Sequence, residues 1–246
     1  MRCMAFIAAR MGSERMPGKV LKNLSGLPAL VHIFNILRES ENLDDFAVVT
    51  TALSEDDEIE NVCIENSVKV VRGSVHDVLD RFRQAANIFK PETIVRVTGD
   101  DPLMDSGIID KVIEAHFTGD YDYTSNIIKR TFPRGMDTEV MRYSALEKSW
   151  RTTADKDDHE HVTLFIRRNP ELFKLKSVES EGEAFDNLRL CLDTEKDYEL
   201  ISEIYTKLYK GKPIKLYEIL NFLNDNPELK NINSEVMQKS VKGKIF

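Results

Sequence analysis

Short apolar runs alternate with segments of helical spacing through the first half of the chain. Four runs are rich in Val, Ile, Phe or Ala and are bounded by polar residues or glycine, which is typical of buried strands. They lie at 3–9, 46–51, 68–71 and 94–97. Between them apolar residues recur every three or four positions, which predicts helices. These helices lie around 30–37 and over 54–66, 76–90 and 106–117. The alternation predicts an α/β fold with a doubly wound, mostly parallel sheet.

Two of the predicted helices begin at a polar residue that favours the N-cap position. Ser54 precedes an acidic first turn, and Asp105 precedes the segment 106–117. We therefore predict Ser54 as an N-cap, and Asp105 as an N-cap in the alternative interpretation, in which Asp100 and Asp101 belong to an Asp-rich turn before the helix.

The second half of the chain is less regular. Residues 120–142 carry polar and Gly/Pro turns around a predicted strand or hairpin arm at 138–141. Further helices are predicted around 157–168, 195–209 and 214–224, and strands at 174–179 and 188–193. No stretch has the composition of a flexible linker. We predict one domain over 1–230, with an excursion at about 125–180, and a polar tail at 231–246.

A cationic, glycine-containing loop directly follows the first predicted strand. Residues 10–19 read RMGSERMPGK, with Arg10, Arg15 and Lys19 as the cations. Ligands of open α/β sheets bind beyond the carboxyl ends of the strands, where glycine lets backbone N–H groups approach phosphate and Arg or Lys supply charge. The loop therefore predicts a site for a nucleoside triphosphate or pyrophosphate; the alternative is a solvated basic turn. It is not a Walker A sequence, because Val20 follows the lysine, and Gly-x-Gly-x-x-Gly is absent.

Carboxylates follow two other predicted strands. Asp100 and Asp101 come after the fourth strand, and Asp193 ends the apolar run 188–192. Mg²⁺ prefers a few carboxylates together with phosphate oxygens. If the two strand ends lie side by side, Asp100 and Asp193 are predicted to hold one Mg²⁺. The alternatives are an Asp-rich turn and an N-cap for the next helix.

Four further residues are candidates for ligand contact. Asp137 and Glu139 share one face of the predicted strand, close to Arg134, which suits a polyhydroxylated substrate; an exposed strand face is the alternative. Arg72 follows the third strand and is predicted to meet the base or a phosphate, or else to be solvated.

Composition excludes several classes of partner. The formal charge of −8 disfavours nucleic acid and anionic membrane surfaces, so a triphosphate has to be attracted by the local basic loop and a metal ion. No apolar run approaches the ~20 residues of a membrane span. The three cysteines show no paired spacing and suit a reducing compartment. We expect a cytoplasmic protein.

Six segments, in unbroken order over about 3–210, match one known family. They are AARMGSERMPGKVL at 8–21, RGSVHDVLDRF at 72–82, VTGDDPL at 97–103, RGMDTE at 134–139, EHVT at 160–163 and LDT at 192–194. The chain resembles the cytidylyltransferases that make CMP-activated acidic sugars, the CMP-Kdo and CMP-sialic acid synthetases, and in particular the spore-coat polysaccharide synthesis protein F group. The Gly-rich L-x-G-G-x-G-x-R loop of hexose-1-phosphate nucleotidyltransferases is absent, which argues against that branch.

The resemblance implies a fold, a reaction and a set of residues. The implied fold is the GT-A-like nucleotidyltransferase sheet, with a β-rich excursion that builds a homodimer. The implied reaction transfers CMP from CTP to a sugar or sugar-like acid and releases pyrophosphate, for surface polysaccharide or glycan synthesis. The implied nucleotide-binding residues are Ala8, Ala9, Arg10, Gly12, Ser13, Arg15, Lys19, Arg72 and Asp77.

The remaining implied roles concern catalysis and the acceptor. The implied catalytic residues are Arg10, Arg15, Lys19 and Asp100; the acceptor-binding residues are Arg134, Asp137 and Glu139; the Mg²⁺ ligands are Asp100 and Asp193. Two alternatives stay open: a GT-A glycosyltransferase that uses a sugar nucleotide, and a catalytically silent nucleotide-binding partner. The base and the acceptor also stay open.

Overall fold

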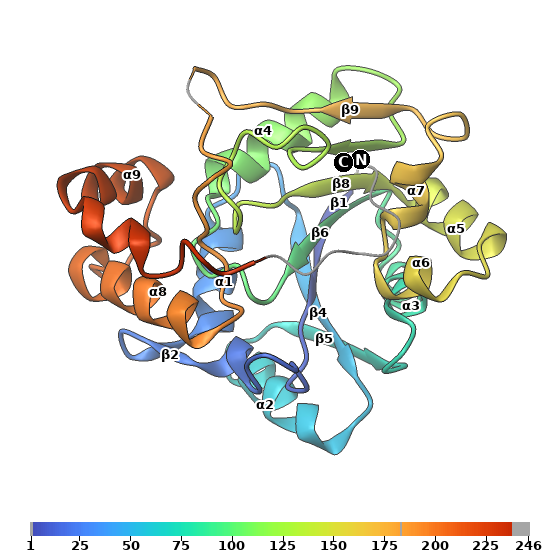
Figure 1. Cartoon of the computed structure of the whole chain (residues 1–246). Helices are drawn as coiled ribbons and strands as arrows, with labels where there is room; N and C mark the ends of the chain where they lie inside the picture. The colour runs from blue at the N-terminus through green and yellow to red at the C-terminus, as the bar shows by residue number, and fades with distance from the viewer. Residues whose placement is uncertain (1, 183, 238–246) are drawn as a thin grey trace.

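One continuous sheet organises the protein. The computed structural model describes residues 2–182 and 184–237. Its sheet strands are β1 (Cys3–Ala8), β4 (Asp45–Thr51), β5 (Lys69–Gly73), β6 (Thr93–Thr98), β7 (Tyr123–Ser125), β8 (Glu139–Arg142) and β9 (Leu175–Ser177). Within the described ranges they pair in the order β5-β4-β1-β6-β8-β7-β9, and β8 alone runs antiparallel to its neighbours (Figure 1). The predicted α/β fold with a mostly parallel sheet is confirmed.

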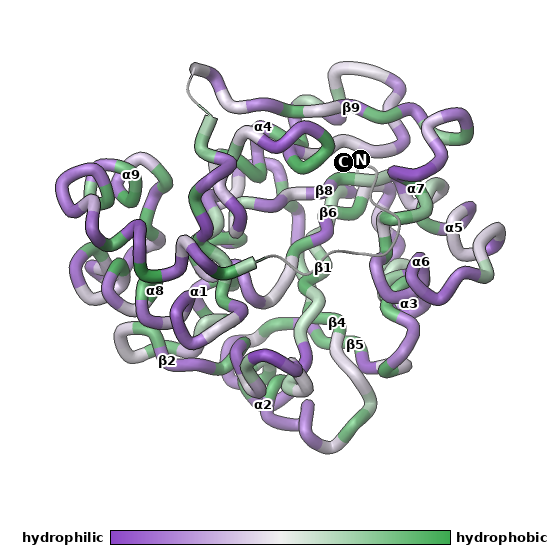
Figure 2. The backbone as a smooth tube through the Cα atoms, viewed as in Figure 1, coloured by the Kyte–Doolittle hydropathy of each residue, from purple (hydrophilic) through white to green (hydrophobic). Residues whose placement is uncertain are grey.

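Helices cover both faces of this sheet. The main helices are α1 (Ala29–Arg38), α2 (Asp57–Glu65), α3 (Val78–Phe89), α4 (Ser106–Phe117), α5 (Tyr143–Thr152), α6 (Lys156–Glu160), α7 (Leu164–Arg168), α8 (Glu195–Leu208) and α9 (Leu216–Asp225). Side chains alternate along β1, so Ala5 and Ile7 pack in one core with α1, α2 and α4. Met4 and Phe6 pack in a second core with α3, α5 and α7. The hydrophobic strands lie between these layers (Figure 2).

The carboxyl-terminal helices form a separate flank. α8 and α9 pack in a third cluster with Met16 and with Leu188, Leu190 and Leu192. α8 begins with a capping box in which Thr194 and Asp197 exchange hydrogen bonds. This flank therefore ties the chain before α8 to the loop after β1. A short ribbon of β2 (Asn23–Leu24) and β3 (Leu27–Pro28) follows that loop and the 3-10 turn η1 (Lys19–Leu21).

Most predicted elements of the first half are confirmed to within three residues. The Asp105 side chain caps α4 by accepting from the Gly107 N–H at 2.8 Å. The Ser54 N-cap is wrong: a 3-10 turn, η2 (Ser54–Asp56), comes first, α2 begins at Asp57, and no side chain caps it.

The middle excursion differs from the expectation. Residues 125–180 are all described. They hold three helices, α5, α6 and α7, and the short strands β8 and β9, so the segment contains more helix than strand and is not β-rich. α5 was not predicted, and the helix predicted over 157–168 is two helices. The break falls where Val162 is buried and the Thr163 hydroxyl donates to Glu139 at 2.5 Å, which draws the chain toward the core.

The predicted strand at 188–193 is extended but does not join the sheet. Its alternating leucines face the third cluster, which explains the strand-like pattern. Its described pairing is one β-bridge between Arg189 and Arg134. Just after the final 3-10 turn, η3 (Pro227–Asn231), Asn233 is buried and donates to the Arg189 carbonyl, so the predicted tail starts as packed structure. Residues 238–246 lie outside the described residues. Within the described chain, no helix has the length and apolarity to cross a bilayer.

Candidate active site

The loop after β1 is held in a fixed shape by a buried carboxylate. Asp56 accepts the Met11 N–H at 2.7 Å, and its other oxygen accepts from Thr50 and Thr51 at the end of β4. The Gly18 N–H donates to the Met11 carbonyl at 2.9 Å and closes the loop on itself. The loop can therefore present its side chains without collapsing into the sheet.

Three segments far apart in sequence meet at the carboxyl edge of the sheet. Because β1 and β6 are neighbours, the Gly99 N–H donates to the Ala8 carbonyl at 2.8 Å. The Leu192 N–H donates to the Asp100 carbonyl at 2.7 Å, which places Asp193 beside Asp100. Gly135 has a φ of +99°, and a Cβ there would lie 2.6 Å from the Leu190 carbonyl carbon. Glycine thus permits the close approach that fixes 188–193 against this edge.

Lys19 joins the two candidate metal ligands. Its ammonium hydrogen-bonds Asp100 Oδ2 and lies 2.6 Å from Asp193 Oδ1, and Arg15 Nη2 lies 2.8 Å from Asp193 Oδ2. Burial alone would lower the pKa of Lys19, but the two carboxylates outweigh it and raise that pKa. Burial would raise the pKa of Asp193, and Lys19, Arg15 and Arg189 together lower it.

A second layer of charges supports Asp193 from behind. Arg189 Nη2 lies 2.7 Å from Asp193 Oδ2, and Arg189 Nε donates to Asp197 Oδ1 at 2.9 Å. Asp197 is fully buried and also accepts the Asp193 N–H at 3.1 Å. Asp193 is consequently fixed by the start of α8.

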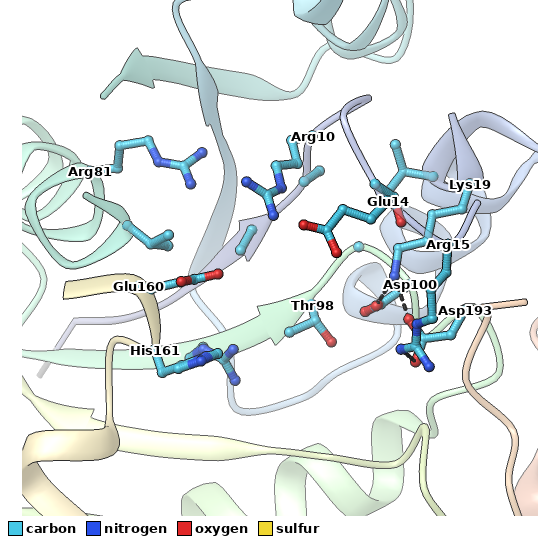
Figure 3. A pocket seen from close by; sticks show the side chains of 17 residues that line it. Arg10, Glu14, Arg15, Lys19, Arg81, Thr98, Asp100, Glu160, His161 and Asp193 are labelled. Carbon is cyan, nitrogen blue, oxygen red and sulfur yellow. Dashed lines mark hydrogen bonds and ion pairs between the residues drawn. The ribbon is translucent and has the colours of Figure 1, made fainter. Parts of the chain in front are cut away.

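A cavity of about 330 Å³ opens at this edge (Figure 3). It is lined by Ala8, Ala9, Arg10, Ser13, Glu14, Arg15, Lys19, Val20, Val78, Arg81, Arg96, Thr98, Gly99, Asp100, Glu160, His161 and Asp193. Its lining holds five Arg or Lys side chains and four Asp or Glu side chains. At one end lie Lys19, Arg15 and the two aspartates, and at the other Arg10 and Arg81 point toward each other above Glu160.

Two guanidinium groups in this cavity keep buried N–H groups without partners. In the described chain, Arg81 Nε and Nη1 and Arg96 Nε have no hydrogen-bond acceptor, although Arg81 is only 2% exposed. Burial and then repulsion by Arg10 lower the pKa of Arg81 to about 10. A buried donor without an acceptor is costly, so these groups indicate a place where a ligand supplies the acceptor.

The comparisons with known proteins agree with this geometry. The cytidylyltransferase family model matches residues 4–225. The chain belongs to the cytidylyltransferase family. It is 40% identical over 243 residues to the uncharacterized protein MJ1063 of Methanocaldococcus jannaschii, covering 98% of each chain. It is 36% identical to the spore coat polysaccharide biosynthesis protein SpsF of Bacillus subtilis, covering 90% of this chain and 94% of the relative. A cytidylyltransferase structure from Leptospira borgpetersenii superposes with a TM-score of 0.90 at 30% identity, covering 97% of this chain and all of that one.

The structure of this cytidylyltransferase brings most predicted loop residues together. The predicted residues that line the cavity are Ala8, Ala9, Arg10, Ser13, Arg15, Lys19, Asp100 and Asp193. Gly12 is outside the lining, where a Cβ would lie 2.8 Å from Glu55 Oε1. Asp101, which follows Asp100 in the sequence, does not line the cavity. Its side chain is buried and accepts a hydrogen bond from Thr98 Oγ1 at 2.6 Å.

Two predicted nucleotide residues have other partners. Arg72 Nη1 lies 2.6 Å from both Asp57 and Glu60 of α2, and its Nε donates to the Thr51 carbonyl, so its guanidinium braces the end of β4 outside the cavity. Asp77 is the N-cap of α3 and accepts from the Asp80 N–H at 2.7 Å.

The predicted acceptor residues are not all available to a ligand. Glu139 is buried at 1% exposure, where it pairs with Arg96 across the strands and accepts from Tyr123 at 2.5 Å, so it cannot contact an acceptor directly. Asp137 is held by Arg130 through two hydrogen bonds of 2.6 and 2.8 Å. Arg134 makes no side-chain hydrogen bond within the described ranges, and its backbone pairs with Leu188 and Leu190.

Sequence reasoning gave no role to several residues that line the cavity. They are Glu14, Arg81, Arg96, Thr98, Glu160 and His161. Arg81 and Glu160 stand inside the motifs that carry the family resemblance, which is a usable signal. Arg96 lies within an apolar strand, where a lone arginine is itself unusual.

The donor set around Asp100 fits a magnesium ion. The described residues contain no group of three or more His, Cys, Asp or Glu suited to a metal. Mg²⁺, however, is commonly bound by one or two carboxylates together with substrate phosphates and water. Asp100 and Asp193 supply two carboxylates that already share one cation, the Lys19 ammonium.

Proposed function

We propose that this chain transfers CMP from CTP to a sugar or sugar-like acid and releases pyrophosphate. The observation that carries the proposal is the convergence of the loop cations with Asp100 and Asp193 in one cavity. The same cavity holds Arg81, whose Nε and Nη1 have no acceptor among the described residues. Membership in the cytidylyltransferase family supports CTP as the donor. The similarity to SpsF supports a role in making a surface polysaccharide or glycan.

The loop residues act chiefly by position and charge. An acceptor oxygen attacks the α-phosphorus and forms the new P–O bond, while the bond to the bridging oxygen breaks and its electron pair leaves with pyrophosphate. The acceptor hydroxyl releases its proton to solvent. Arg10, Arg15 and Lys19 hold the triphosphate in line and stabilise the charge that grows on the leaving group.

Charge balance favours a metal ion in this reaction. Five cationic against four acidic side chains leave the cavity far short of the charge of a triphosphate. Asp100 and Asp193 are the residues that would hold Mg²⁺, and the ion would supply positive charge that neutralises the charge developing on the phosphates.

A pyrophosphate-release screen tests the proposal. Each of the four nucleoside triphosphates is incubated with the protein, Mg²⁺ and a panel of acceptors comprising keto-acid sugars, sugar phosphates and polyol phosphates. We expect release with CTP and one acceptor class, and none without Mg²⁺. Release of nucleoside diphosphate from a sugar nucleotide, without pyrophosphate release, would instead identify a glycosyltransferase. Nucleotide-dependent thermal stabilisation without turnover would identify a silent binding protein.

A further inference from the structure

We call the cavity of about 330 Å³ in the candidate active site the nucleotide cavity. His159 lies outside its lining and connects two of the cavity's walls. His159 Nδ1 lies 2.8 Å from Asp77 Oδ2, and His159 Nε2 lies 3.2 Å from the Thr153 carbonyl oxygen. Both ring nitrogens therefore face acceptors. An imidazole can donate from both nitrogens only when it is protonated, so this geometry selects the imidazolium form.

Asp77 and His159 each stand directly before a residue that lines the nucleotide cavity. Asp77 caps α3, which carries Val78 and Arg81 into the cavity. His159 precedes Glu160, which ends α6 and also lines the cavity. The pair thus connects the wall built by α3 to the wall built by α6.

A second cavity, of about 590 Å³, adjoins the first on the other side of this pair. Its lining is Arg10, Val75, His76, Asp77, Ala154, Lys156, His159 and Glu160. Arg10 and Glu160 line both cavities. Asp77 and His159 line only the second cavity, and their chain neighbours Val78 and Glu160 line the first. The position of the pair therefore affects where the walls of the nucleotide cavity stand at the end that holds Arg81.

We propose that His159 and Asp77 form a clasp that holds the α6 wall against the α3 wall, which makes His159 a positioning residue for nucleotide binding. The inference rests on the proposed function, because it takes CTP as the ligand of the cavity. The clasp lies away from Lys19, Asp100 and Asp193, so it acts on nucleotide affinity more than on the chemical step.

The clasp weakens as pH rises. Burial would lower the pKa of His159, but the hydrogen bonds to Asp77 and Thr153 outweigh it and raise that pKa above its ordinary value of 6.5. The stabilisation is therefore complete below pH 6.5 and is lost as pH rises through the raised pKa. Other charged or titratable groups near the pair are Arg81 of α3, Asp158 of α6, Arg168 of α7, and Arg10, His76, Lys156 and Glu160 in the adjoining cavity.

Titration of the His159 imidazole by NMR, combined with CTP affinity, tests the clasp. We expect a His159 pKa above the ordinary value that rises further when CTP is bound, because coupling is reciprocal. The dissociation constant of CTP with Mg²⁺ is expected to rise about fivefold between about pH 7 and about pH 9. His159→Gln removes the His159 contribution to this dependence, raises KM for CTP more than it changes kcat, and leaves KM for the acceptor unchanged.

Two further variants separate the clasp from general damage. Asp77→Asn keeps a good N-cap for α3 but removes the charge, so it lowers the pKa of His159 and weakens CTP binding at about pH 7. His76→Gln alters a histidine of the same cavity and keeps the wild-type pH dependence. If wild type binds CTP and His159→Gln retains its full pH dependence, the clasp is refuted and the proposed function stands. If wild type neither binds CTP nor releases pyrophosphate, the proposed function fails, and the clasp with it.

Discussion

The two ends of the nucleotide cavity differ in whether their cationic side chains are paired with carboxylates. At one end Lys19 and Arg15 are bound to Asp100 and Asp193, and Asp193 is supported in turn by Arg189. At the other end Arg81 keeps two buried N–H groups without an acceptor in the described chain. We call these the paired end and the unpaired end.

The difference separates two ways of binding an anion. At the paired end, a ligand or metal ion has to replace the existing contacts of Lys19 and Arg15 with Asp100 and Asp193. Such an end suits the phosphate groups whose charge changes during the reaction. At the unpaired end a ligand satisfies donors that otherwise destabilise the fold. Loss of a residue should therefore reduce turnover at the first end, and should reduce affinity but not stability at the second.

The largest effect is expected for Asp100→Asn at the paired end. Loss of this carboxylate should lower kcat by about 100-fold or more, or roughly 3–4 kcal/mol, on the scale of removing a preorganised charge-stabilising group. Circular dichroism should show an intact fold, and pyrophosphate release measures turnover. Asp101→Asn is the matched control, because its side chain is buried away from the cavity. Equal loss in both variants would contradict the role given to Asp100.

Glu139→Gln should have the largest effect on stability. Burial would raise the pKa of Glu139, but Arg96 and Arg167 outweigh it and lower that pKa, so the carboxylate is charged. Its removal leaves the half-buried Arg96 guanidinium without its counter-charge, and the free energy of unfolding should fall by about 3 kcal/mol. Urea denaturation measures this. A change below ~0.5 kcal/mol would show that Arg96 finds another partner.

The acid stability of the paired end depends on Asp193. Burial would raise the pKa of Asp193, but Lys19, Arg15 and Arg189 outweigh it and lower that pKa from 3.8 to about 2. The contribution of Asp193 to stability is therefore present above pH 3.8 and is lost as pH falls through the lowered pKa of about 2. Wild type should exceed Asp193→Asn in unfolding free energy by roughly 2 kcal/mol at neutral pH, and by almost nothing near pH 2. Denaturation curves across this range would refute the assignment if the difference stayed constant.

The smallest effect on stability is expected for Arg81→Met. The sign of the change in unfolding free energy is the informative result. Replacement of a desolvated, unpaired guanidinium by an apolar side chain should raise the free energy of unfolding by about 1 kcal/mol. The same change should weaken CTP binding about tenfold, because it removes donors that a ligand would satisfy. Thermal unfolding and calorimetry measure the two quantities. A variant that is less stable and still binds CTP normally would remove the distinction between the two ends.

The sequence alone determined the layers of the fold and one half of the cavity. Periodic apolar residues report which face of an element is buried, and this sufficed for β1, β4, β5 and β6 and the helices between them. Parallel strands bring their carboxyl ends to one edge of a sheet, so the sequence alone predicts that the Arg10–Lys19 loop and Asp100 lie close together. Apolar periodicity was misleading at 188–193, where alternating leucines predicted a sheet strand. The segment is extended but joins no strand of the sheet.

The tertiary structure alone decided which charges pair. Asp100 and Asp101 are adjacent in sequence, yet one enters the cavity and the other is buried against Thr98. Arg72 braces α2, Glu139 supports Arg96, and Asp77 binds His159. Such choices depend on contacts between segments tens of residues apart and on irregular turns, where no periodicity constrains the direction of a side chain. Patterning fixes burial, whereas the partner of a charge depends on which distant groups the packed fold brings within reach.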